Sequence, residues 1–455
     1  MTDSEMLEVE REFDVGEGDG PPAPALLRGV DGVGPPEEAP GIVYFDTAGL
    51  ALASRRITLS RRTGGPHAGW RLNLALPVGG RQEFSAPVGR NPEVVPRRLR
   101  QLVQVHTRDR DVIPVATLHN PRTSQRVFAA EGTALADFSE DRVEFARGVE
   151  GQNRPAADSP PGPAPEGPAS AAFLAYLGQQ VEALKKHDPG VREDAPDSVH
   201  QLRVAARRIR STLATFRKLA DSGATGTLRS ELQWLAGTVG EARDNEVMQA
   251  RLLALIGAEP QELLLGPVAQ RIAEHFDAAA PGARAKGLIA LKSARYFRLL
   301  DSLDAFLAEP PLTETAAMGA LQTVDRIVSD EIRRLRRKVD ALDVDSVSAA
   351  QEAALHEVRK SAKRVRYAAE AAVPIFGKQA DTLARAAAEI QESLGEHQDS
   401  VVTAALLLEL AANASGAQAF TYGRLHAREQ LGGDAARRRF FRTWQESPPD
   451  PFRWK

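Results

Sequence analysis

The sequence predicts an α+β protein of two domains, a β-rich N-terminal domain and an all-helical C-terminal domain. Three observations predict this fold class. Polar and apolar residues alternate with the period of two that is typical of strands in residues 1–150. Proline and glycine dominate residues 151–169, which is typical of an extended linker. Apolar residues then recur at helical spacing through residues 170–455.

The composition limits the class of protein. The chain has 455 residues, of which 42% are hydrophobic, enough for two or three domains. It has no cysteine, so disulfides and thiolate metal sites are excluded and we expect a cytoplasmic protein. A net charge of −3 argues against a generic nucleic-acid binder, which would normally have a strong basic excess, and we expect no specific nucleic-acid partner. The acidic N-terminus and the absence of a long apolar run predict neither an export signal nor a membrane span.

Acidic residues mark the first predicted strand. In residues 7–13 acids alternate with mostly apolar residues, which places Glu8, Glu10 and Glu12 on one side of the strand. Paired acids on one strand face repel each other unless a cation lies beside them. We therefore favour metal ligation by Glu8 and Glu10, and the alternative is a solvated face of an edge strand.

Several motifs of residues 1–150 resemble the CYTH family of triphosphate tunnel enzymes. They are Glu8-Val9-Glu10-Arg11-Glu12-Phe13, Tyr44-Phe45-Asp46-Thr47, Arg61-Arg62-Thr63-Gly64-Gly65 and Trp70, and the resemblance covers most of residues 5–148. It implies an antiparallel β-barrel around a tunnel, in which glutamates hold a divalent cation and basic residues hold a triphosphate. Hard oxygen ligands suit Mg²⁺ or Mn²⁺ as the cofactor. On this basis the metal ligands are Glu8, Glu10 and Glu144, and the triphosphate ligands are Arg62, Arg71, Arg108 and Arg110.

Two positions depart from the pattern of that family. Glu12 stands where the Glu-x-Glu-x-Lys opening has lysine, and Asn73 stands where a second lysine usually follows the tryptophan. Both changes remove a phosphate-binding cation, and Glu12 adds a negative charge. The resemblance therefore predicts a degenerate tunnel domain with weak or no triphosphatase activity.

An amphipathic helix is predicted over residues 198–218. At about 100° per residue, one arc carries cations and the opposite arc is apolar. The cationic arc consists of His200, Arg203, Arg207 and Arg210, and the apolar arc of Leu202, Ala206, Ile209, Leu213 and Phe216.

This arrangement occurs a second time, which indicates an internal repeat. His356, Arg359, Lys363 and Arg366 have the same spacing as the first cationic arc. Each copy is followed by a glycine-to-aspartate landmark, Gly240-Glu241-Ala242-Arg243-Asp244 in the first and Gly395-Glu396-His397-Gln398-Asp399 in the second. Two landmarks at nearly one offset exclude coincidence, and we place the repeats at about 170–311 and 312–447.

These repeated residues resemble the CHAD family of helical domains. The resemblance implies two pseudo-symmetric helical bundles that face each other across a basic surface and bind inorganic polyphosphate, with no cofactor. Regularly spaced arginines suit that ligand because each guanidinium offers forked donors to phosphate oxygens. The predicted polyphosphate ligands are His200, Arg203, Arg207, Arg210, Lys292, Arg295, His356, Arg359, Lys363 and Arg366.

The alternative for the basic arcs is an ordinary solvated helix face. We disfavour it because neither arc carries acids four residues after its cations, as salt-bridged surfaces do. Surrounding cations should keep His200 and His356 neutral near pH 7, and Asp244 and Asp399 should orient arginines rather than act as bases.

Three functions remain open from the sequence. The leading one is a polyphosphate-binding protein, associated with polyphosphate granules, whose tunnel domain is degenerate. The second is an active metal-dependent triphosphatase or polyphosphatase to which the helical domain delivers substrate. The third is a scaffold at the granule surface that recognises acidic partners.

Overall fold

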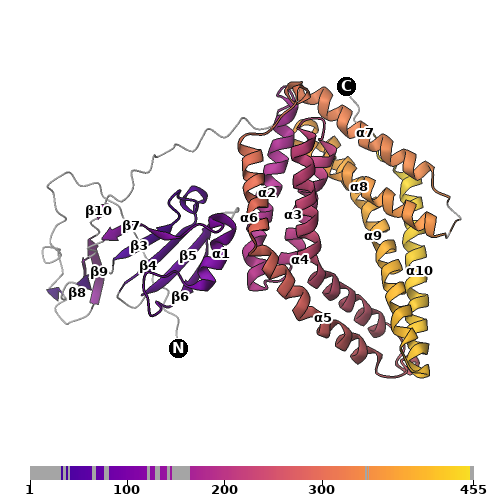
Figure 1. The fold of residues 1–455 in the computed structure, drawn as a ribbon, viewed down its shortest axis with the longest axis horizontal. Helices are drawn as coiled ribbons and strands as arrows, with labels where there is room; N and C mark the ends of the chain where they lie inside the picture. The colour runs from indigo at the N-terminus through magenta and orange to yellow at the C-terminus, as the bar shows by residue number, and fades with distance from the viewer. Residues whose placement is uncertain are drawn as a thin grey trace. The chain divides into compact units, whose positions relative to one another are not determined.

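The computed structural model describes residues 32–33, 37–38, 41–63, 68–75, 81–119, 123–128, 134–140, 144–145, 164–343, 346 and 348–450. The chain divides into two compact units, Met1–Asn153 and Arg154–Lys455. The division falls at the start of the proline-rich tract. The first unit contains β-sheet and the second is helical, which confirms the predicted order of a β-rich and an all-helical part (Figure 1).

The described strands of the first unit form two antiparallel sheets. The larger has the order β10-β7-β3-β4-β5-β6, and in the smaller β8 pairs with β1, β2 and β9. Closure into the barrel that the CYTH resemblance implies stays a prediction. The larger sheet comprises β3 (Ile42–Asp46), β4 (Thr58–Arg62), β5 (Gly69–Ala75), β6 (Arg81–Ala86), β7 (Ile113–His119) and β10 (Glu144–Phe145), and the smaller β1 (Gly32–Val33), β2 (Glu37–Glu38), β8 (Thr123–Phe128) and β9 (Ala134–Glu140).

Helix α1 (Arg97–Thr107) covers one face of the larger sheet. Its buried leucines pack in one cluster with Phe45 and Trp70, whose ring centroids are 4.6 Å apart. Side chains alternate between the faces of a strand, so the neighbours of Trp70 and Leu59 point away from this core. Arg62 and Arg71 therefore share the sheet face opposite α1.

The helical unit contains the same order of packed neighbours twice. In each half a first helix packs on a second, the second on a long third, and the third on a fourth. The first half comprises α2 (Ala169–Glu193), α3 (Ser198–Thr215), α4 (Ser222–Gly257), α5 (Val268–Leu291) and α6 (Ala294–Ala308), and the second α7 (Ala320–Asp340), α8 (Ala349–Phe376), α9 (Lys378–Ala412) and α10 (Gly416–Glu446).

Backbone bonds join the two halves where α2 and α7 begin. The amide of Ala169 donates to the carbonyl of Met318 at 2.9 Å, and the amide of Ala320 donates to the carbonyl of Gly167 at 2.8 Å. The reciprocal pair places the first helices of the two halves in equivalent positions, and α3 also packs directly on α8.

The far ends of the long hairpins meet as a second junction. In Figure 1 the tips of α4 and α5 lie beside the tips of α9 and α10. Buried Glu259 accepts hydrogen bonds from Arg424 and Arg428, each with a contact of 2.7 Å. An apolar cluster that includes Leu252, Phe276 and Leu407 packs at the same junction.

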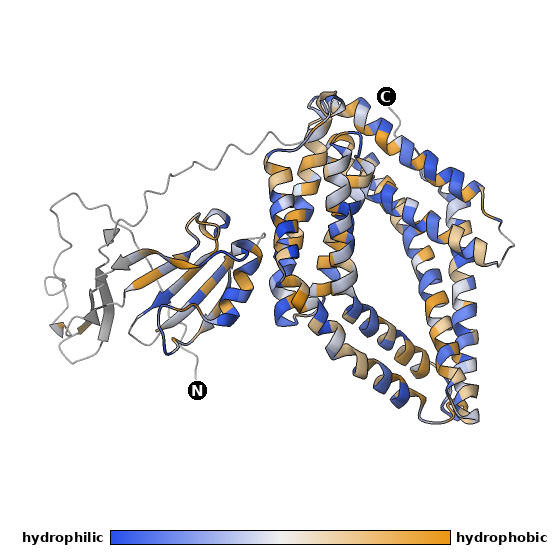
Figure 2. Ribbon diagram, in the orientation of Figure 1, coloured by the Kyte–Doolittle hydropathy of each residue, from blue (hydrophilic) through white to orange (hydrophobic). Residues whose placement is uncertain are grey.

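The burial pattern of α3 and α8 follows the amphipathic pattern of their sequences. Leu202 and Ile209 of α3 and Val358 and Val365 of α8 have no exposed surface. Hydrophobic and hydrophilic residues alternate along the helices of this unit (Figure 2). No helix in the described part of the chain is long and apolar enough to span a membrane.

Candidate functional site

A groove of 830 Å³ lies where α3, α4 and α8 meet. It brings residues of the two predicted basic arcs into one cavity, although those arcs are separated by about one repeat in the sequence. Its charged or ionisable lining consists of Arg203, Arg207 and Arg210 from α3, Arg229 from α4, and His356, Lys360, Lys363 and Arg364 from α8.

The charge of this groove has one sign. Seven of its lining residues are lysine or arginine, and none of the described lining residues is aspartate or glutamate. Lysine and arginine on ordinary solvated helices commonly alternate with acids that pair with them. Outside the lining, Arg203 pairs with Asp244 and Lys360 pairs with Glu357. The cations of the lining still outnumber these acids, so the groove favours an anionic occupant.

Lys363 is the most strongly affected of these cations. Burial and the neighbouring charges of Arg359, Arg207 and Arg210 lower the pKa of Lys363 to about 7, against an opposing effect of Asp399. The pKa of Arg210 is also lowered, by burial and by Arg229 and Arg207. Cations from three helices thus repel each other in the empty groove. A bound anion would reduce this electrostatic repulsion.

Two arginines of the arcs retain buried donors. The Nε atoms of Arg207 and Arg359 are inaccessible to solvent and have no hydrogen-bond partner within the described residues. An unsatisfied buried donor costs about 1–3 kcal/mol. Small rearrangements that present these donors to an anion would recover part of that cost.

The landmark after the first arc holds Arg203 in place. Arg203 Nη1 donates to Asp244 Oδ1 at 2.6 Å, and Nη2 donates to Asp244 Oδ2 at 3.1 Å. Its guanidinium lies against Gly240, where an added Cβ would come within 2.6 Å of Cζ. The glycine gives Arg203 room to cross α4, and the aspartate orients it.

The second landmark places its glycine against Arg359, but less closely. A Cβ added to Gly395 would lie 3.3 Å from Nη2 of Arg359. Burial and Arg207 lower the pKa of Arg359, whereas the nearby Asp399 acts against that shift. Arg359 is therefore influenced electrostatically by Asp399 of its own repeat and by Arg207 of the other repeat.

The two histidines have different surroundings. His356 lines the groove, and its Nδ1 is 3.1 Å from Gln398 Oε1, which can only accept a hydrogen bond. Burial, Lys360 and Arg359 lower the pKa of His356, which agrees with the expectation that it is neutral near pH 7. His200 is exposed at the start of α3, outside the described groove lining.

Arg366 departs from the predicted arc. Its Nε donates to Glu370 Oε1 at 2.9 Å, an i,i+4 pair, so the expectation that neither arc carries such an acid is wrong for α8. Glu370 also lies 3.6 Å from Arg208 and accepts a hydrogen bond from Tyr176. Arg366 belongs to this cluster around Glu370 and is not among the described residues that line the groove.

Lys292 and Arg295 lie away from the groove lining. Lys292 is the C-cap of α5. Arg295 pairs with Glu231 at 2.6 Å and lies over the ring of Trp234, 4.1 Å from its centroid. A cation held by both a carboxylate and an aromatic ring has less need of an external anion.

The predicted triphosphate ligands of the first unit occupy three kinds of site. Arg62 and Arg71 lie on the sheet face opposite α1, and Arg71 is 3.5 Å from Glu83. Arg108 is buried at the C-cap of α1 with φ 61°, whereas Arg110 is exposed. Asn73 donates to Thr58 at 3.3 Å.

The structure describes little of the predicted metal site. Glu8 and Glu10, and also Glu12, lie outside the described residues, and only the backbone of Glu144 is described, paired with His119. Within the described residues no cluster of three or more His, Cys, Asp or Glu side chains could hold a metal ion. Metal ligation by Glu8, Glu10 and Glu144 therefore stays a prediction.

Three charged residues of the described groove lining were not predicted from the sequence. Lys360 and Arg364 follow Arg359 and Lys363 directly, so a wider arc on α8 would have included them. Arg229 is on α4, and only the packing of α4 against α3 brings it beside Arg210. No local sequence pattern marks it.

The chain matches a known family of domains and is similar to two proteins over most of its length. The model of the CHAD domain matches residues 175–408. Two uncharacterized proteins of Mycobacterium tuberculosis are each 34% identical over 488 residues, covering 93% of this chain and 93% of the relative.

Two solved structures resemble the chain. PptA from Streptomyces chartreusis is 26% identical with a TM-score of 0.54, over 61% of this chain and 99% of that chain. The CHAD domain from the plant Ricinus communis is 28% identical with a TM-score of 0.50, over 62% of this chain and 94% of that chain.

Proposed function

The chain belongs to the CHAD domain family, and from that premise we propose that its helical unit binds linear inorganic polyphosphate in the groove between α3, α4 and α8. One observation carries the proposal. Seven lysines and arginines from three helices line a single cavity without an acid among the described lining residues. A linear polyanion offers a charge at every unit and can meet such a row of donors along its length.

The size of the groove favours a single chain. A volume of 830 Å³ is within the range of small-ligand sites, about 300–1,000 Å³. Along α3 the cations from Arg203 to Arg210 span about 10 Å at 1.5 Å per residue. Several consecutive phosphates can contact this stretch at once, so long chains should bind more tightly than pyrophosphate.

Titration of the full chain tests the proposal. Long-chain polyphosphate, pyrophosphate and duplex DNA are compared at two salt concentrations by calorimetry. We expect long chains to bind most tightly and with a strong salt dependence, because cation contacts release counterions. Equal binding of DNA and polyphosphate would contradict it, and binding of acidic proteins without polyphosphate binding would favour a scaffold.

For the first unit we propose a degenerate triphosphate-binding domain. The shared sheet face of Arg62 and Arg71 supports this proposal, and Glu83 beside Arg71 and Asn73 on the same face weaken its charge. If Glu8, Glu10 and Glu144 hold Mg²⁺ or Mn²⁺, the ion would reduce the repulsion between their carboxylates and the phosphates. We expect little phosphate release from triphosphate with either metal, and rapid release abolished by Glu8→Gln would establish an active triphosphatase instead.

We propose a cellular location from the polyphosphate binding of the helical unit. Polyphosphate bound by the helical unit would bring the protein to polyphosphate granules in the cytoplasm. Fluorescent fusions in cells with and without polyphosphate test this, and foci that persist without the polymer would contradict it.

A further inference from the structure

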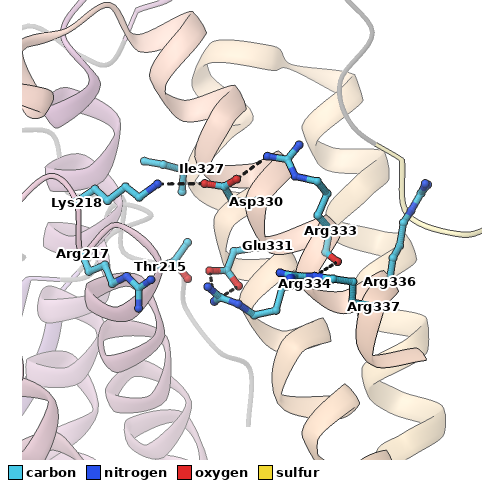
Figure 3. Close-up of a pocket in the computed structure, with 10 residues that line it drawn as sticks. All are labelled: Thr215, Arg217, Lys218, Ile327, Asp330, Glu331, Arg333, Arg334, Arg336 and Arg337. Carbon is cyan, nitrogen blue, oxygen red and sulfur yellow. Dashed lines mark hydrogen bonds and ion pairs between the residues drawn. The ribbon is translucent and has the colours of Figure 1, made fainter. Parts of the chain in front are cut away.

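A second basic pocket lies between the end of α3 and the side of α7. Its volume is 550 Å³, and it shares no lining residue with the groove among the described residues. Figure 3 shows side chains from the two elements projecting toward each other across it. The lining consists of Thr215, Arg217, Lys218, Ile327, Asp330, Glu331, Arg333, Arg334, Arg336 and Arg337.

Most charges of this pocket are already paired. Asp330 accepts from Lys218 at 3.2 Å and from Arg333 at 2.5 Å. Buried Glu331 accepts from Arg334 at 2.7 Å. The two carboxylates of the lining are thus each occupied by cations of the lining itself.

Three other arginines line the pocket, Arg217, Arg336 and Arg337. Arg336 donates to the carbonyl of Pro449 at 2.8 Å and pairs with Asp450 from the C-terminal segment. Arg337 Nε donates weakly to the carbonyl of Arg333 at 3.4 Å. In the described part of the chain no ion pair neutralises Arg217 or Arg337, so the pocket has two arginines available for an anion.

Thr215 supplies an independent observation. It is 5% exposed and lines the pocket, and its Oγ1 is buried with no hydrogen-bond partner in the described structure. In Figure 3 it lies between Arg217 and the α7 side chains of Glu331 and Arg334. Buried hydroxyls are nearly always hydrogen-bonded, and an unmet one costs about 1–3 kcal/mol.

We propose that this pocket is a second anion site that binds a phosphate group, with Arg217 and Arg337 as its charged donors and the Thr215 hydroxyl as its neutral donor once the Thr215 side chain turns toward the ligand. Guanidinium forks and a hydroxyl together match the tetrahedral oxygens of phosphate. The phosphate is either a free small molecule, such as pyrophosphate, or the end of a longer chain. The site does not rest on the function proposed for the groove, because the linings are separate.

The first experiment isolates the pocket. The full chain carrying Arg207→Glu and Lys363→Glu, which disable the groove, is titrated with pyrophosphate by calorimetry. We expect binding to persist in this background and to weaken at least about tenfold when Arg217→Ala and Arg337→Ala are added. A matched control adds Lys378→Ala and Arg438→Ala, which are exposed cations outside both linings.

A second arm distinguishes the two sources of phosphate. Long-chain polyphosphate is titrated into the otherwise unchanged protein with and without Arg217→Ala and Arg337→Ala. Pyrophosphate binding that depends on these arginines identifies a free phosphate. Weaker long-chain binding without pyrophosphate binding identifies a chain end, and an effect in neither arm overturns the site.

Thr215→Val separates a ligand contact from a structural role. The change removes an unpartnered hydroxyl at nearly constant volume, so the melting temperature without ligand should be unchanged or higher. Affinity for the phosphate source found above should fall about fivefold, since one hydrogen bond is lost. Unchanged affinity, or a lower melting temperature with unchanged affinity, would contradict the assigned role of the hydroxyl.

Discussion

The guanidinium of Arg203 occupies the space that a side chain at Gly240 would fill. An added Cβ would come within 2.6 Å of both Cζ and Nε of Arg203. The same contact recurs in weaker form between Arg359 and Gly395, where the closest approach is 3.3 Å. The glycines of the two landmarks therefore limit the positions of Arg203 and Arg359, which are side chains of neighbouring helices.

Gly240→Ala should weaken polyphosphate binding without unfolding the protein. Arg203 must move and lose its alignment with Asp244, which we expect to cost about five- to tenfold in affinity. Alanine is the better helix former by about 1 kcal/mol, so the melting temperature should not fall greatly. Calorimetric titration with long-chain polyphosphate and thermal melting measure the two effects.

Gly237→Ala is the matched control for that change. Gly237 is on the same helix and lines the groove, but an added Cβ meets nothing within 4 Å. Its affinity should stay close to that of the parent, and Gly395→Ala should have an intermediate effect. Equal losses at Gly237 and Gly240 would show that the room for Arg203 is not the cause.

Polyphosphate affinity should fall as the pH rises above about 7. The pKa of Lys363 is about 7 in the free protein, and a bound polyanion would raise that pKa by favouring the charged amine. Below about pH 7 the amine is already charged, so affinity changes little there. Between pH 7 and the higher pKa of the complex, binding takes up a proton, and affinity falls by up to about tenfold per pH unit.

Titrations across this range, with proton uptake measured in buffers of different ionisation enthalpy, check the prediction. Lys363→Arg keeps the charge and should flatten the profile. The pKa of His356 is lowered, so it is neutral over the same range and contributes little. A profile with the same slope in Lys363→Arg would exclude Lys363 as the group that titrates.

Glu259 should stabilise the protein only above the pH at which it is charged. Hydrogen bonds from Arg424 and Arg428 hold the pKa of Glu259 below its ordinary 4.5. A depressed carboxyl pKa contributes stability that is complete above about pH 4.5 and is lost as the pH falls through the folded-state pKa. Glu259→Gln should therefore lower the melting temperature at neutral pH by an amount equivalent to about 1–3 kcal/mol.

The difference in melting temperature between the parent and Glu259→Gln should become smaller as the pH falls. Melting curves of the parent and Glu259→Gln at several values from about pH 7 to pH 3 measure it. A constant difference over this range would show that the charge of Glu259 is not what joins the hairpin tips.

The sequence predicts the pair of basic helices because it repeats both the cations and the apolar positions that bury the opposite face. That repeat is enough to assign Arg207 and Lys363 to one surface. Arg229 could not be assigned in this way, since its place beside Arg210 depends on how α4 crosses α3. The same limit applies to Arg295, whose contact with Trp234 depends on the packing of α6 against α4.

Arg366 is a different case, because its partner Glu370 is four residues away and is visible in the sequence. The repeat predicts the cations because their spacing matches in the two halves. It does not include Glu370, which pairs with Arg366. In the first unit, the alternating pattern of β4 and β5 correctly predicts that Trp70 and Arg71 lie on opposite faces of the sheet. Barrel closure depends on long-range strand pairing, which no local pattern determines.

The most direct test of the single-groove account is the double variant Arg207→Glu and Lys363→Glu. Both side chains line the groove from different repeats, and both lie opposite the apolar faces of their helices. A control with Lys378→Glu and Arg438→Glu makes the same change in net charge at exposed positions outside the groove. Long-chain polyphosphate is titrated into the parent and both variants at matched salt, with circular dichroism to verify the helical fold.

We expect the groove variant to lose affinity on the order of a hundredfold, equivalent to about 2.8 kcal/mol, while the control loses little. If the groove variant keeps its helical spectrum and binds long-chain polyphosphate as tightly as the parent, the two basic arcs are ordinary solvated helix faces.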